Sequence, residues 1–204
     1  MLSVYALKTR FQRLLRPLAG WLASSGITAN QVTVGTCLLA IGVGAWLAVK
    51  NQNRALLLLL PIFFLIRMAL NAIDGLMACD FGQKSNLGAY LNELTDVVSD
   101  AFLYLPFAYL PGFDPLWIGA IIVLSAVSEM AGVLTVRMGA GRRYDGPMGK
   151  SDRALAFGAA GLWLGMGESF AQWASLTFSV GMVALLLLTI VNRVRNGLAE
   201  SPKL

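Results

Sequence analysis

The sequence predicts an all-α integral membrane protein, with six transmembrane helices preceded by an N-terminal amphipathic helix. The chain of 204 residues is 57% hydrophobic and 13% charged, whereas soluble domains carry about 45–50% apolar and roughly 25% charged residues. The mean hydropathy of +0.67 agrees with this class. Apolar runs also alternate with short polar breaks along the whole chain. This length accommodates six spans of about 20 residues each.

The apolar runs predict spans at 32–49, 55–78, 87–110, 115–138, 153–167 and 170–192. The second of them contains the least ambiguous stretch, because residues 56–65 are all apolar. The fifth is the shortest. Since no stretch remains for a soluble domain, we expect one membrane domain over 1–204, with its helical bundle at about 30–192.

Segment 3–22 has a different pattern. Apolar residues recur there at helical spacing, and four basic side chains are interspersed among Val4, Leu7, Phe11, Leu14, Leu15 and Leu18. Such a pattern is typical of a helix that lies on an anionic membrane surface, with basic side chains reaching the headgroups. The alternative is a soluble arm packed on another element. A cleavable signal peptide is not expected, because the segment lacks a clean apolar core.

The distribution of basic residues predicts the orientation in the membrane. With six spans, thirteen of the sixteen Lys and Arg residues fall on the side that holds both termini, against Lys50 and Arg54 on the other. Basic loops stay in the cytoplasm, so we expect cytoplasmic termini in a bacterial inner membrane. Membrane lipids account for the net charge of +5, and no nucleic-acid partner is expected.

The lack of histidine and the small number of cysteines exclude several kinds of catalytic and metal site. The chain has no histidine, which excludes a histidine base, a Ser-His-Asp triad and a zinc–histidine site. Its two cysteines, Cys37 and Cys79, lie in unlike surroundings and predict neither a structural disulfide nor a thiolate metal site.

Acidic residues gather around the break between the second and third spans. Five of the eleven lie between positions 74 and 100, namely Asp74, Asp80, Glu93, Asp96 and Asp100. Helical spacing puts Asn71 and Asp74 on one face, and Asn92, Asp96 and Asp100 on one stripe. Facing oxygen ligands of this kind suit Mg²⁺, Mn²⁺ or Ca²⁺. A hydrogen-bonded network of protonated carboxyls, or an ion path through a transporter, are the alternatives.

The same residues resemble the signature of the CDP-alcohol phosphatidyltransferases, D-x2-D-G-x2-A-R-x8-G-x3-D-x3-D. The chain reads N-A-I-D-G-L-M-A-C over 71–79, then eight residues, then G-A-Y-L-N-E-L-T-D over 88–96. The segment G-I-T-A-N-Q-V-T at 26–33 resembles the one that opens the first span in this family. The spacing matches throughout, but Asn71 and Asn92 stand at Asp positions and Cys79 stands at the Arg position.

The resemblance implies a metal-dependent enzyme that is a homodimer. One or two Mg²⁺ or Mn²⁺ ions would be held by Asn71, Asp74, Asn92 and Asp96, with Asp96 as the general base. Two Asn in place of Asp lower the charge of the site from −4 to −2, so Glu93 and Asp100 are candidate substitutes as ligands. The resemblance implies a nucleotide site formed by Asn30, Thr33, Asp74, Gly75, Ala78, Cys79, Ser85 and Gly88.

A glycine-rich basic loop at 139–153 lies on the same side as this cluster. Glycine backbone and basic side chains favour phosphate binding. We therefore expect Arg137, Lys150 and Arg153 to bind the acceptor or a phosphate. The alternative is a basic loop that contacts anionic lipid.

The function expected from the resemblance is transfer of a phosphatidyl group from a CDP-linked lipid, such as CDP-diacylglycerol, to an acceptor alcohol, with release of CMP. One rival is a relative that binds a CDP-lipid or metal without turnover, which the changes at positions 71, 79 and 92 favour. The other rival is a small transporter.

Overall fold

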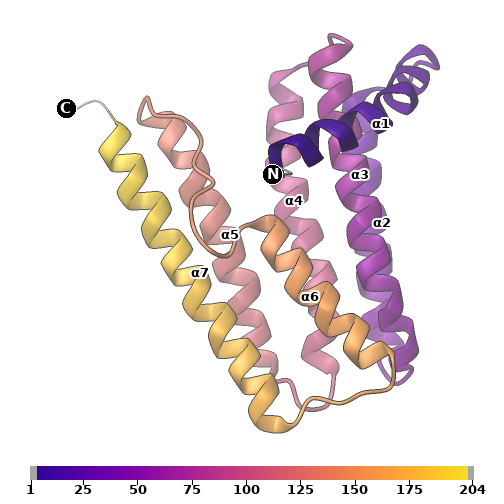
Figure 1. Ribbon diagram of the computed structural model, residues 1–204, viewed down its shortest axis with the longest axis vertical. Coiled ribbons are helices and arrows are strands. Elements are labelled where there is room, and N and C mark those ends of the chain that lie inside the picture. Colours follow the sequence, from indigo (N-terminus) through magenta and orange to yellow (C-terminus); the bar gives the residue numbers. More distant parts are fainter. Residues whose placement is uncertain (1–3, 202–204) are drawn as a thin grey trace. The chain divides into compact units, whose positions relative to one another are not determined.

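The structure is a computed structural model that describes the backbone of residues 4–201 and the side chains of residues 10–201. The described residues form seven α-helices and two short 3-10 helices (Figure 1). In chain order they are α1 (Val4–Ser24), α2 (Ala29–Val49), η1 (Arg54–Leu58), α3 (Leu59–Asp80), α4 (Asn86–Tyr104), η2 (Leu105–Tyr109), α5 (Pro115–Arg137), α6 (Lys150–Gly165) and α7 (Gln172–Glu200).

These elements confirm the all-α class, and every predicted span coincides with a helix. Within residues 4–201, four helical stretches are long and apolar enough to cross a membrane: Ala29–Val49, Arg54–Asp80, Pro115–Arg137 and Gln172–Glu200. The helix α4 carries three carboxylates, and α6 has only 16 residues, so both are weaker candidates by composition or length. A count of six spans therefore stays a prediction.

The last helix differs most from its predicted span. The predicted span ends at about 192, whereas α7 continues to Glu200. Arg193 is 1% exposed and its Nη1 donates to the carbonyl oxygen of Ser128 at 2.5 Å. Gly197 is also buried. The helix therefore extends past the predicted span, because a buried guanidinium with protein partners does not end a helix.

Contacts divide the chain into two units. The first comprises Met1–Gly42 and Ile62–Ser99, and the second comprises Val43–Pro61 and Asp100–Leu204. The core of the first unit joins α1 to the start of α2 and the end of α3, through Ala19, Ala29, Ile73, Leu76 and Met77.

The helix α1 has a second apolar stripe that the protein does not cover. Leu14 is 76% exposed and Trp21 is 62% exposed, while Ala19 is fully buried. A helix with one face in the protein core and an exposed apolar face suits the predicted position at a membrane surface. Ser3 lies outside the described residues, and the side chains of Val4, Leu7 and Lys8 lie outside the described side chains.

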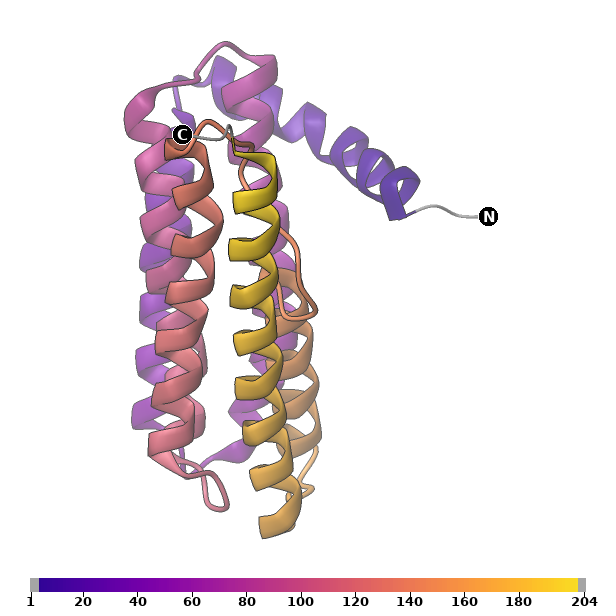
Figure 2. The same cartoon turned by 90° about the vertical axis from the view of Figure 1, so that its left-hand side faces the viewer.

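In the second unit, α5 and α7 lie side by side and run in the same direction (Figures 1 and 2). The return path is the loop 138–149 followed by the short α6. An aromatic cluster packs beneath α6, where the rings of Tyr104 and Phe157 stack at 4.1 Å and Phe107 meets Phe157 edge-on at 4.9 Å. This burial holds the second unit together.

Gly165 allows α6 to pack closely against η1. A Cβ atom at this position would lie 2.8 Å from the backbone nitrogen of Leu58. We predict that Gly165→Ala lowers the apparent melting temperature in detergent by at least about 3 °C, because overpacking destabilises by roughly 1–3 kcal/mol. Gly181→Ala on α7 is the matched control, since no atom lies within 4 Å of its Cβ position. Equal melting temperatures for the two variants would contradict this packing.

Candidate functional site

In the first unit, the candidate site forms where α2 begins, α3 ends and α4 begins. A capping box starts α2: the Thr28 N–H donates to Gln31 Oε1 at 2.9 Å, and the Gln31 N–H donates to Thr28 Oγ1 at 3.2 Å. Capping boxes satisfy two N–H groups that lack helical partners. This local geometry fixes the direction in which Asn30 and Thr33 leave the helix.

Asp74 is held by a residue from another helix. Asp74 is 6% exposed, and the Thr33 hydroxyl donates a hydrogen bond to Asp74 Oδ2 at 2.7 Å. The same hydroxyl lies 3.0 Å from the carbonyl oxygen of Ala29. A buried carboxylate requires such partners, because an unsatisfied charge inside a protein is strongly unfavourable. The predicted nucleotide-site residue Thr33 and the predicted metal ligand Asp74 are therefore in direct contact.

Asp96 is held by two side chains of α3. Arg67 Nη2 lies 3.3 Å from Asp96 Oδ1 and 3.1 Å from the Asp96 carbonyl oxygen. Asn71 Nδ2 donates to the same Oδ1 at 3.2 Å. Arg67 is 3% exposed, whereas the Asp96 side chain is 16% exposed. The predicted catalytic residue is thus fixed in orientation and remains at an accessible edge.

The start of α4 brings three predicted nucleotide-site residues together. Ser85 caps the helix, with its Oγ accepting the Gly88 N–H at 3.0 Å. A Cβ atom at Gly88 would lie 2.8 Å from Asn30 Oδ1, so glycine is needed for this close approach. Gln83 was not among the predicted site residues; its Oε1 accepts the Ala29 N–H at 2.6 Å and connects this loop to α2.

The remaining predicted residues of the first unit lie on the same helix ends. Gly75 and Cys79 are exposed and Ala78 is half-buried. No atom lies within 4 Å of a Cβ position at Gly75, so its backbone is open to a ligand. Asn92 and Glu93 are half-buried on α4. Glu93 has partners of its own.

The candidate ligands suit a divalent cation, but they carry little negative charge. Asp74, Asp96, Asn71 and Asn92 supply carboxylate and amide oxygens, which Mg²⁺ and Mn²⁺ accept. Among the described residues, no group of three or more His, Cys, Asp or Glu is arranged to hold a metal. Two carboxylates with amide oxygens therefore fit one ion better than two.

In the second unit, Arg153 lies inside a buried ionic cluster. Its Nη2 lies 2.8 Å from Asp100 Oδ2 and 3.0 Å from Glu129 Oε1, and the residue is 1% exposed. Arg193 and Arg142 lie 3.3 and 3.4 Å from Glu129 Oε2. Asp100, a predicted substitute metal ligand, and Arg153, a predicted phosphate-binding residue, are thus partners of each other.

The basic loop 138–149 folds back along α5 and α7. The Arg143 N–H donates to the Gly132 carbonyl, and the Met148 N–H donates to Thr189 Oγ1 at 3.0 Å. Gly146 has a φ of 113°, and a Cβ atom there would lie 2.6 Å from Thr189 Cα. Only glycine accommodates this turn.

Charged residues at the outer end of this loop pair with one another. Arg143 contacts Asp145 at 2.6 Å, and this hydrogen bond lowers the pKa of the Asp145 carboxyl. Hydrogen bonds to Asp145 and Glu200 raise the pKa of Arg143. The predicted phosphate-binding residues Arg137 and Lys150 lie at the end of α5 and the start of α6, the first exposed and the second half-buried.

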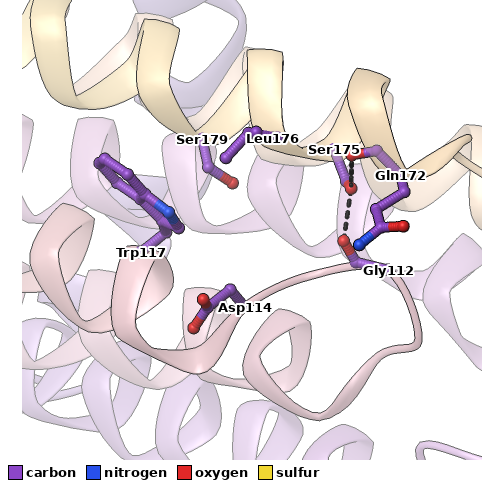
Figure 3. Close-up of a pocket in the computed structure, with 7 residues that line it drawn as sticks. All are labelled: Gly112, Asp114, Trp117, Gln172, Ser175, Leu176 and Ser179. Atoms are coloured by element: carbon purple, nitrogen blue, oxygen red, sulfur yellow. Dashed lines mark hydrogen bonds between the residues drawn. The ribbon is translucent and has the colours of Figure 1, made fainter.

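A cavity of about 140 Å³ opens at the beginning of α5 and α7 (Figure 3). Asp114, Trp117, Gln172 and Ser179 line it, together with Ser175, whose hydroxyl donates to the Gly112 carbonyl. It contains none of the predicted site residues.

Comparisons with known proteins identify the family. The profile of the CDP-alcohol phosphatidyltransferase family matches residues 26–192. The chain is 41% identical over 203 residues to the inner membrane protein YnbA of Escherichia coli, and the match covers 100% of each chain.

Solved structures share the fold. Phosphatidylinositol phosphate synthase (PgsA1) of Mycobacterium tuberculosis, in complex with manganese and citrate, superposes with a TM-score of 0.75 at 19% identity over 92% of this chain and 90% of that one. The same enzyme with CDP-DAG bound gives a TM-score of 0.71 at 21% identity, over 93% and 96%. With the family profile covering most of its length and a full-length relative in an inner membrane, this integral membrane chain belongs to the CDP-alcohol phosphatidyltransferase family.

Proposed function

We propose that the protein transfers a phosphatidyl group from a CDP-linked lipid, such as CDP-diacylglycerol, to an acceptor alcohol and releases CMP. The observation that carries this proposal is the convergence of α2, α3 and α4, which brings Thr33 to Asp74 and Asn71 to Asp96. Family membership supports the reaction class. The CDP-DAG bound to PgsA1, which has the same fold, supports the choice of donor.

The acceptor hydroxyl oxygen attacks the β-phosphorus of the donor. The bond between that phosphorus and the CMP oxygen breaks, and CMP leaves with the electron pair. Asp96 takes the hydroxyl proton as general base. Arg67 and Asn71 orient its carboxylate through Oδ1. No covalent enzyme intermediate is needed.

Asn71, Asp74, Asn92 and Asp96 would hold the divalent ion. When bound, Mg²⁺ or Mn²⁺ neutralises charge on the diphosphate. The hydrogen bond from Thr33 positions the Asp74 carboxylate to hold the ion. The open backbone at Gly75 lets the cytidine diphosphate approach α3, and Asn30, Ala78, Cys79, Ser85 and Gly88 line the remainder of the nucleotide site.

Arg137 and Lys150 bind a phosphate on the acceptor or the donor. Arg153 belongs to the same subsite, but its two carboxylate partners favour a positioning role over direct contact. A basic subsite favours an acceptor that carries phosphate, because charged hydrogen bonds between Lys or Arg and phosphate are strong. The assembly is a homodimer in the inner membrane, with both termini and the site facing the cytoplasm.

A second candidate function is a relative that binds the CDP-lipid without turnover. The close contact of Arg67 with Asp96 favours it, because the guanidinium already occupies the Oδ1 atom of the proposed base. Binding of CDP-diacylglycerol by purified protein that releases no CMP with any acceptor alcohol would select this function.

The first prediction of the proposal concerns Asp96. Purified protein with CDP-diacylglycerol, Mn²⁺ and a pool of acceptor alcohols should release CMP, and the mass of the lipid product names the acceptor. Asp96→Asn should lower this rate by about 10²–10⁴-fold, since it removes the general base. Glu168→Gln is the control, because Glu168 is an exposed carboxylate outside the proposed site. Undiminished CMP release by Asp96→Asn would contradict the assignment.

Thr33 and Thr36 offer a matched pair on α2. Both are buried, and each hydroxyl is within bonding distance of the carbonyl four residues earlier, but only Thr33 also contacts Asp74. We expect Thr33→Val to lower kcat/KM by about 10- to 100-fold, since a hydrogen bond to a charged group contributes about 1.5–3 kcal/mol. Thr36→Val should stay within about threefold. Equal losses would indicate a packing effect alone.

Cysteine labelling tests the orientation. In a variant without Cys37 and Cys79, a membrane-impermeant maleimide should label Asn53→Cys in spheroplasts with an intact inner membrane, because few basic residues flank that side. Lys84→Cys should react only after permeabilisation. The reverse pattern would invert the topology.

A further inference from the structure

The cavity at the beginning of α5 and α7 contains a polar group that the protein leaves without a hydrogen bond. Ser179 is 1% exposed, and it lines the cavity together with Asp114 and Trp117. Figure 3 shows its hydroxyl directed toward the space between these two side chains. Within the described side chains of residues 10–201, no group bonds this hydroxyl. A buried hydroxyl without a partner is unfavourable, so the cavity is suited to a polar occupant.

The charge of the cavity favours a cation. The carboxylate of Asp114 uses Oδ1 to accept the Leu116 N–H at 2.8 Å. Since an ionised carboxylate has about four acceptor positions, it retains acceptors for a ligand. The two segments that form the lining, 112–117 and 172–179, contain no Lys or Arg. Among the residues that the structure describes, no basic side chain pairs with Asp114.

Trp117 and the hydroxyl of Ser179 narrow the kind of cation. An indole ring attracts a cation that lies over its face, and Ser179 Oγ and Gln172 Oε1 can accept hydrogen bonds. A primary ammonium has three N–H donors for such acceptors, whereas a quaternary ammonium has none. A single carboxylate is a poor site for Mg²⁺ or Ca²⁺, which require about six or more oxygen ligands.

The size of the cavity sets an upper limit on the ligand. Its volume is about 140 Å³. A water molecule occupies about 30 Å³ in the liquid, so there is room for about four or five non-hydrogen atoms. An ethanolammonium group is of this size. A nucleotide is much larger, and the cavity contains no residue of the proposed active site.

We propose that this cavity binds a small primary ammonium, such as an ethanolammonium group, through Asp114, Ser179 and Trp117. Free ethanolamine and a lipid headgroup that ends in ethanolamine offer the same chemistry. The proposed orientation puts this end of α5 and α7 on the outer side of the membrane. The inference goes beyond the proposed function, because it assigns a second ligand to a separate place in the fold.

The first test is a calorimetric titration of the full chain in detergent with ethanolammonium chloride. We expect saturable binding with a Kd of about 1 mM or tighter. Tetramethylammonium should bind at least about tenfold more weakly, because it has the charge but no N–H donor. Asp114→Asn keeps the cap on α5 and removes the charge, so it should weaken ethanolammonium binding at least about tenfold. Glu168→Gln, which changes an exposed carboxylate before α7, should stay within about twofold.

Two tryptophans offer a second matched pair. Trp117 lines the cavity, whereas Trp173 on α7 is 73% exposed and is not part of the lining. Trp117→Leu should weaken ethanolammonium binding by about 3- to 30-fold through loss of the cation–π contact. Trp173→Leu should bind as the wild type does. If Trp117→Leu does not fold, the comparison of Asp114→Asn with Glu168→Gln still decides.

Native mass spectrometry distinguishes the two sources of the ligand. The full chain is mixed with equal amounts of phosphatidylethanolamine and phosphatidylcholine that carry the same acyl chains. Preferential retention of phosphatidylethanolamine that Asp114→Asn abolishes identifies the lipid headgroup. Saturable ethanolammonium binding without this preference identifies the free amine.

The proposal would be overturned by the absence of both effects. Equal affinity for tetramethylammonium, or binding that Asp114→Asn leaves unchanged, would overturn it as well. Neither readout involves CMP release, so failure of this inference leaves the proposed function untouched, and failure of the proposed function leaves this inference untouched.

Discussion

Charges inside this protein are held by opposite charges, and this pairing determines how its helices meet. Water does not stabilise an ion within a bilayer, so a buried guanidinium or carboxylate needs a protein partner. In the first unit, Arg67 on α3 contacts Asp96 on α4. In the second, Arg153 on α6 contacts Asp100 at the end of α4 and Glu129 on α5. Losing one member of such a pair leaves an uncompensated charge, which is more damaging than the absence of both.

Contacts that stabilise the first unit also fix the orientation of the two carboxylates of the candidate site. Thr33 holds Asp74, and Arg67 with Asn71 holds Asp96, so both carboxylates are fixed before any ligand arrives. Preorganised groups accelerate reactions because they need little rearrangement in the transition state. The buried cluster around Glu129 joins α5, α6 and α7, where Arg193 also donates to the Ser128 carbonyl oxygen.

Local patterns predicted most of the fold and supplied the candidate residues of the site, whose roles stay predictions. Apolar runs placed the helices, and helical spacing placed Asn71 and Asp74 on one face of α3. Pairings between distant residues could not be predicted. Asn71 contacts Asp96 while Asp74 contacts Thr33, 41 positions away. The sequence predicts phosphate binding by Arg153 because it follows a basic loop, but its contact with Asp100, 53 positions away, could not be predicted. The contact of Arg193 with the Ser128 carbonyl oxygen on α5 could not be predicted either.

The loop that folds back along α5 and α7 also limits the length of α6. It takes up chain length at one end of α6, whose 16 residues extend only about 24 Å, less than the roughly 30 Å of a typical hydrocarbon core. If α6 spans the membrane as the sequence predicts, the bilayer beside it thins or admits headgroups more deeply, a hydrophobic mismatch that favours thin membranes.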